Sequence, residues 1–137
     1  MVIVLVSAVS TSLDDAVAAF NRGEYFDAAE LFEKAVAAID PELKDLAGAL
    51  NRIAAAMHLR FERGGRQATI NLLSQAMLTL DDMKPAKGGI DTARLFDEIF
   101  AFTEEIRGAP RDDRSGLKHR ARIFLERHRA PKINHAR

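Results

Sequence analysis

Apolar residues recur at intervals of three and four along most of this chain, from residue 13 to residue 125. This spacing places them on one face of an α-helix, which completes a turn every 3.6 residues. No segment after residue 10 alternates apolar and polar residues over the length of a useful strand. The pattern therefore predicts an all-α protein, a compact array of five to six helices.

Glycine, proline and capping residues divide this pattern into separate helices. Gly23 ends a first helix that begins near Ser12, and a second helix is expected over 26–39. Asp40 and Pro41 fit the start of a third helix, since proline lacks only an N–H that needs no partner in the first turn. The first two helices, joined by a short glycine turn, are expected to form an antiparallel hairpin.

The remaining helices are bounded in the same way. The sequence Arg-Gly-Gly-Arg at 63–66 separates the third helix from a fourth, expected over 67–83, and these two form the second hairpin. Asp91 is a suitable N-cap for a fifth helix, and Ser115 for a basic sixth helix that ends near Pro131. The core of the array is thus expected to be two antiparallel helical hairpins.

The length of 137 residues suits one domain, which buries about two thirds of its unfolded surface. We expect an apolar N-terminal arm at 1–11, a helical core domain at 12–107, and a basic helix and tail at 108–137. The arm begins with Met-Val-Ile-Val-Leu-Val, which lacks the cationic start of a secretory signal and the roughly 20 residues of a membrane span. A cytoplasmic protein that does not use a membrane is expected.

The net charge of zero hides a division along the chain. Residues 1–106 contain 10 Lys and Arg against 17 Asp and Glu, whereas residues 107–137 contain 10 against 3. The chain is therefore an acidic body of charge −7 with a basic tail of charge +7. Cysteine is absent, which excludes disulfides and thiolate metal sites, and we expect no cofactor.

The first hairpin has the small-residue and aromatic spacing of a tetratricopeptide unit, in which small residues let helices approach and aromatic rings fill the gaps. The positions that carry this spacing are Gly23, Tyr25, Ala28, Phe32, Ala35 and Pro41. The second hairpin repeats the pattern loosely. Two units are too few for a solenoid, so tetratricopeptide-like hairpins are only the second choice of family.

A longer likeness covers residues 13–107. FNRGEYFDAAELFEKAV, an alanine-rich helix, RGGRQATINLLSQAM and GGIDTARLFDEI follow one another in this order. Their order resembles domain-of-unknown-function family 309, which comprises small helical bacterial and archaeal proteins. The resemblance implies a predicted metal-dependent hydrolase with a His-x-x-x-Glu-x-x-Trp motif on the second helix. The corresponding positions here are Ala29, Glu33 and Val36, so only the glutamate remains.

Two interpretations of Glu33 remain open. It is either an acid kept from an ancestral site or a carboxylate at the rim of the packed face, where lone carboxylates usually lie. His58, the only histidine in the body, could face Glu33 across a helix pair as a replacement ligand or base, or Glu30 could be recruited. His58 could equally be a hydrogen-bonded surface histidine, and Glu30 with Lys34 fits an ordinary ion pair.

Two basic features offer further candidate sites. Arg63 and Arg66 stand just before a helix N-terminus, where backbone N–H groups can hold an anion, although a simple helix-stop turn explains them as well. The tail could contact phosphates of a nucleic acid, or it could dock on the acidic body of its own chain or of a second copy. Its cations are Lys118, Arg120, Arg122, Arg127 and Arg129.

The loss of two motif residues favours a non-catalytic protein-interaction or self-association module over an enzyme. The alternatives are a metal-dependent hydrolase that uses Glu33 and a nucleic-acid-binding protein that uses the tail.

Overall fold

A computed structural model of the chain describes residues 13–109 and 116–137. The first helix is described from residue 13 to residue 21. It is followed by α2 (Tyr25–Ala38), α3 (Pro41–Arg63), α4 (Gln67–Asp81), α5 (Thr92–Gly108) and α6 (Leu117–His128). The only β-structure within these ranges consists of the isolated bridges that Ile90 forms with Lys87 and His135. The prediction of an all-α fold built on helical hairpins is confirmed.

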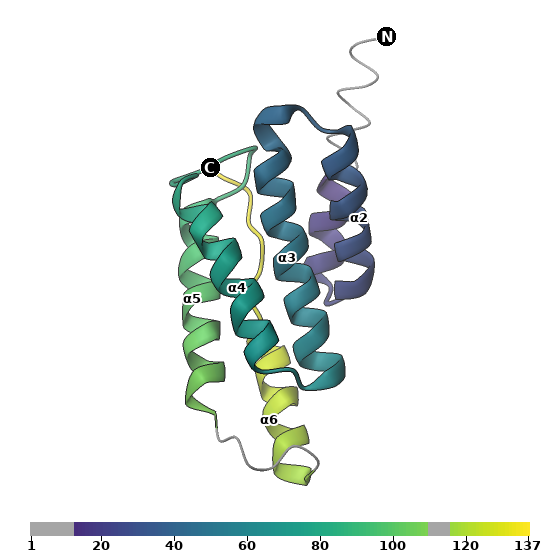
Figure 1. Cartoon of the computed structure of the whole chain (residues 1–137), viewed down its shortest axis with the longest axis vertical. Coiled ribbons are helices and arrows are strands. Elements are labelled where there is room, and N and C mark those ends of the chain that lie inside the picture. Colours follow the sequence, from purple (N-terminus) through teal and green to yellow (C-terminus); the bar gives the residue numbers. More distant parts are fainter. Residues whose placement is uncertain (1–12, 110–115) are drawn as a thin grey trace.

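Consecutive helices from the first to α5 run antiparallel, and α3 lies at the centre of the array (Figure 1). One side of α3 packs against α2 and the other against α4, and α5 packs in turn on α4. The sixth helix, α6, contacts the C-terminal part of α3, below the other helices in the view of Figure 1. The central position of α3 follows from its sequence, because apolar and small residues cover more than one of its faces.

The helix ends fall where glycine and capping residues predict them. Gly64 ends α3 with a left-handed φ of 67°, and its N–H donates to the Arg60 carbonyl at 2.9 Å. The next N–H, of Gly65, donates to the Leu59 carbonyl at 3.2 Å, so these two backbone hydrogen bonds close the last turn of α3. At the start of α5 the Asp91 carboxylate accepts the Arg94 N–H at 2.9 Å. The predicted caps Ser12 and Ser115 and the arm 1–11 lie outside the described residues.

The core runs along the whole helical array. Its largest fully buried side chains belong to the first helix and to α2, α3, α4 and α5, and to the loop before α5: Phe20, Phe32, Leu46, Leu50, Ile53, Met57, Leu73, Leu80, Ile90, Leu95, Ile99 and Ile106. One continuous cluster therefore holds both hairpins together.

The last residues of the chain return to this core after α6. Ile133 is 2 % exposed, and its backbone N–H and carbonyl bond the two side-chain atoms of Asn21 at 2.9 and 2.8 Å. Further along, the Asn134 carbonyl accepts the Asp91 N–H at 2.9 Å, and the Ala136 N–H donates to the Gly89 carbonyl at 2.8 Å. The segment after α6 thus joins the first helix to the loop before α5, and it shares one core with the helical body.

No helix in the two described ranges combines the length and the apolar character that crossing a membrane requires.

Candidate functional site

The three motif positions lie along one side of α2, but they form no site with one another. The Ala29 carbonyl accepts the Asn51 side-chain amide at 2.8 Å, which ties α2 to α3, and Val36 is half-buried. Glu33 is exposed, and no hydrogen bond or ion pair joins it to another described residue. Its surroundings are those of a solvated rim carboxylate.

The structure does not bring Glu33 and His58 together. The His58 ring stacks at a tilt on Phe26, with 5.4 Å between the ring centroids. Phe26 and Glu33 are seven residues apart on α2, which places them about 10 Å apart along the helix axis. Glu30 is exposed as well. Within the described ranges no three His, Asp or Glu side chains lie close enough to hold a metal ion.

His58 instead lines a small cleft of about 270 Å³ beside the turn between the first helix and α2. The other lining residues are Gly23, Glu24, Tyr25, Phe26, Asp27, Glu62 and Arg127. Arg127 reaches this cleft from α6, where its guanidinium bonds the Gly23 carbonyl at 3.2 Å and pairs with Glu62 at 3.5 Å. Burial raises the pKa of the Tyr25 phenol, and the nearby Arg127 charge opposes this shift. The cleft is thus partly closed by the tail.

The two arginines of the Arg-Gly-Gly-Arg turn have different positions. The Arg66 guanidinium donates to the carbonyls of Ala109 and Arg107, at 2.7 and 2.6 Å. These carbonyls belong to the C-terminal end of α5, where the helix dipole favours a cation. Arg63 is exposed. Arg66 therefore fixes the end of α5 in this structure, and an anion site at this turn stays a prediction.

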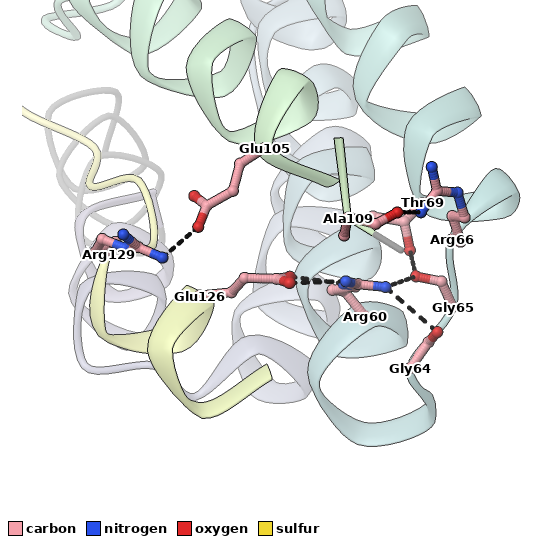
Figure 2. A network of polar contacts seen from close by, with 9 residues as sticks. All are labelled: Arg60, Gly64, Gly65, Arg66, Thr69, Glu105, Ala109, Glu126 and Arg129. Atoms are coloured by element: carbon pink, nitrogen blue, oxygen red, sulfur yellow. Dashed lines mark hydrogen bonds and ion pairs between the residues drawn. The ribbon is translucent and has the colours of Figure 1, made fainter. Parts of the chain in front are cut away.

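The most unusual polar contact joins α3 to α6 (Figure 2). The Arg60 Nε and Nη2 donate to the two Glu126 carboxylate oxygens, both at 2.7 Å. The side chains are only 3 % and 0 % exposed. A third guanidinium nitrogen of Arg60, Nη1, donates to the Gly65 carbonyl at 3.2 Å, so both members of the pair have their polar atoms occupied. Such a planar, two-bond contact fixes the orientation of α6 as well as its position.

With this contact, α6 buries its polar side and exposes its apolar side. Glu126 is its one fully buried residue, and His119 and Ile123 lie on the same side, half-buried. The opposite side carries Leu117 and Phe124, which are 82 % and 61 % exposed. A surface helix normally buries its apolar side, so α6 has the reverse arrangement. We call the residues Leu117, Ala121, Phe124 and Leu125 the outer face of α6; Leu125 is 53 % exposed.

The cations of the tail fall into two groups. Arg129 donates a hydrogen bond to Glu105 on α5 (Figure 2). Arg127 pairs with Glu62 on α3, so both arginines tie the tail to the acidic body. Lys118, Arg120 and the half-buried Arg122 form no ion pair with any residue that the structure describes, and the first two of these flank the outer face. The outer face of α6 is therefore an apolar stripe between two cations.

A second apolar surface lies between α4 and α5. It is a groove of about 340 Å³ lined by Ser74, Met77, Leu78, Asp81, Phe96 and Phe100. Leu78 and Phe100 are 74 % and 52 % exposed, and both line this one groove. We call these six residues the α4–α5 groove. Contiguous exposed apolar side chains of this kind are typical of surfaces that bind other molecules.

Sequence reasoning did not single out Arg60 or Glu126. The sequence nevertheless contains a sign that each of these residues is unusual. Arg60 follows Ile53 and Met57 at helical spacing, so it interrupts the apolar face of α3, and Glu126 is the single acid among residues 116–137. A lone charge on an apolar face and a lone charge of opposite sign elsewhere are together a reason to expect a buried pair.

No family model matches this chain, and the comparisons with curated proteins and with solved structures found no match either.

Proposed function

We propose that this chain is a non-catalytic protein-interaction module that binds its partner through the outer face of α6. The observation that carries the proposal is the reversed orientation of α6, which buries Glu126 and leaves Leu117 and Phe124 in solvent. Removing each of these large side chains from water is worth about 1.5–3 kcal/mol, so burial of the outer face by a partner favours binding.

The orientation is built into the fold and is not a matter of local helix preference. A helix of 12 residues is marginal in water by itself, so contacts with the body decide how α6 lies. The Arg60–Glu126 pair supplies the strongest of these contacts. A buried ion pair is often no more stabilising than apolar packing would be, whereas it does specify one arrangement. Its value here is to hold the outer face toward a partner.

The surroundings of Glu33 give less support to a metal-dependent hydrolase. Glu33 is solvated and stands apart from His58. Elemental analysis of the purified chain tests this alternative. Stoichiometric zinc, manganese or iron that Glu33→Ala releases would replace the interaction proposal with an enzyme.

Nucleic-acid binding by the tail is also less well supported, because Arg127 and Arg129 pair with acids of the body. A cytoplasmic location remains part of the proposal.

Photocrosslinking from α6 tests the proposal directly. A photoreactive amino acid replaces Phe124 in one variant and Phe26, an aromatic residue of similar exposure on α2, in the control. We expect a discrete protein adduct from position 124, identified by mass spectrometry, and none from position 26. Equal labelling from both positions, or none from position 124, would contradict the proposal.

A further inference from the structure

The outer face of α6 and the α4–α5 groove have complementary shapes. One is a helical stripe of Leu117, Phe124 and Leu125, and the other is a groove between two helices. An amphipathic helix that lays its apolar side chains into such a groove is a common mode of recognition. In this structure α6 packs on α3 through Glu126 and its outer face lies in solvent, so the two surfaces are not in contact within one copy. They can meet when they come from two copies.

The charges around the two surfaces are also complementary. Helix α6 contains four Lys and Arg and one Glu, a net charge of +3, whereas residues 67–108 contain seven acids and four bases, a net charge of −3. Next to Phe100, the acidic residues Asp97 and Glu104 lie on the exposed side of α5. Glu104 pairs with Arg107 at 3.5 Å, whereas Asp97 forms no ion pair with a residue that the structure describes. Opposite charges around an apolar contact increase the association rate and select the partner.

The same charges disfavour the simpler symmetric contacts. Two outer faces placed together would oppose Lys118 and Arg120 of one copy to those of the other. Two α4–α5 grooves would oppose two segments of net negative charge, although at the groove itself Asp81 is paired with Lys84 at 3.2 Å. Like charges facing each other across an interface cost affinity. The groove of a second copy is therefore a better partner for the outer face than a second α6.

We propose that the outer face of α6 binds the α4–α5 groove of a second copy of this chain. The inference rests on the proposed function and names its partner. Two copies form a closed dimer when each places the outer face of its α6 in the groove of the other. Copies joined head to tail form a longer assembly. Both arrangements contain the same junction, between Ala121 and its neighbours on one copy and Ser74 and its neighbours on the other.

Single cysteines test this junction, because the chain has none of its own. Ala121→Cys places a thiol on the outer face, Ser74→Cys places one in the groove, and Ala37→Cys, exposed on α2, is the matched control. The Ala121→Cys and Ser74→Cys proteins are mixed at equal concentration under mild oxidation. A specific complex raises the effective concentration of the two thiols, so we expect about tenfold more mixed disulfide than from the Ala37→Cys and Ser74→Cys mixture.

Four outcomes overturn the proposal. The mixed disulfide is no more abundant than the control; or Ala121→Cys pairs mainly with itself, which indicates contact between two α6 helices; or the intact chain stays monomeric and sediments with phosphatidylserine vesicles in a way that Phe124→Ser abolishes. The last result would assign the outer face to an anionic membrane. A protein adduct from position 124 with another protein, together with a monomeric chain, would overturn this inference and leave the proposed function standing.

Complementary variants give a second readout that does not depend on cysteine chemistry. Leu117→Ser with Phe124→Ser removes the outer face, and Leu78→Ser with Phe100→Ser removes the groove; all four residues are more than half exposed, so the fold is expected to persist. In sedimentation velocity each variant alone is expected to be monomeric, while their mixture forms a dimer through the one junction left intact. Association of either variant by itself, or a mixture that stays monomeric, would refute the pairing.

Discussion

Removal of one partner from the Arg60–Glu126 pair is expected to release α6 and the segment behind it. In Glu126→Leu the Arg60 guanidinium loses two hydrogen bonds of 2.7 Å and remains 3 % exposed, with no carboxylate to balance its charge. The chain can then either bury an unpaired charge or lift α6 to let water reach it. Lifting α6 is the cheaper response when few other contacts hold the helix, and here α3 is its main neighbour.

The size of the effect follows from the burial of the pair. Truncating one member of a buried ion pair costs about 3–5 kcal/mol, because the remaining charge is left without a partner. A domain of this length has roughly 7–20 kcal/mol of total stability, so the loss is a large fraction of it. Arg60→Met should cost more than Glu126→Leu, since Arg60 also donates to the Gly65 carbonyl at the end of α3. The double variant replaces the charges by apolar groups of similar length and should recover most of the loss.

A double-mutant cycle by urea unfolding measures this effect, with hydrogen exchange of residues 117–137 to locate it. Arg22→Met with Glu24→Leu is the matched control, since that pair is exposed to solvent and should show little coupling. We expect a coupling of several kcal/mol between positions 60 and 126 and faster exchange in α6 for each single variant. Single variants that each cost less than about 1 kcal/mol and add without coupling would refute the role assigned to the pair.

Three further predictions concern other parts of the chain. Gly64→Ala should destabilise the fold by about 1–2 kcal/mol in thermal unfolding, because φ is 67° there and an added Cβ would lie 2.9 Å from His119 Nε2; unchanged stability would contradict the close approach of α6. Asn21→Ala removes two hydrogen bonds to Ile133 and should cost about 1–3 kcal/mol, with the Ile133 amide exchanging faster; an exchange rate equal to that of the unmodified chain would argue against the anchor. The raised pKa of Tyr25 means that the folded state binds the phenolic proton more tightly, so stability is full below about pH 10 and falls above it. Tyr25→Phe should reduce this alkaline loss in urea titrations, and an identical pH profile in both proteins would be the contrary result.

Much of the fold could be predicted because it depends on local sequence signals. Gly23 and Gly64 supply left-handed turns, Asp91 caps α5 through its side chain, and the apolar spacing marks each helix. These signals act within one or two turns of the chain, so the sequence alone determines them. The helix boundaries, such as Gln67–Asp81 for α4 where residues 67–83 were expected, differ only at the fraying ends.

The arrangement of the tail could not be predicted in the same way. Leu117, Phe124 and Leu125 would normally mark the buried side of a helix, and in this chain they point outward. The reason is a contact between residues 66 positions apart, which no local period records. Similarly, Ile133 is held at the core by hydrogen bonds with Asn21, 112 residues earlier, together with bonds between its neighbours and the loop before α5. Sequence spacing describes helices well, whereas it does not say which long-range polar contact will decide their orientation.

The same limit applies to the candidate site. The resemblance to family 309 predicts a site at Ala29, Glu33 and Val36, where the fold places one half-buried alanine, one solvated acid and one half-buried valine. The outer face of α6 and the α4–α5 groove were identified only from exposure, because their residues are individually ordinary.

The concentration dependence of sedimentation tests the central claim most directly. The intact chain is compared with Leu117→Ser/Phe124→Ser and with Phe26→Ser, which removes an equally exposed aromatic ring elsewhere. The account predicts that the chain and Phe26→Ser associate alike, and that the α6 variant, which lacks the outer face, stays monomeric over the same range of concentrations. Equal association in all three proteins, or none in the intact chain, would contradict it.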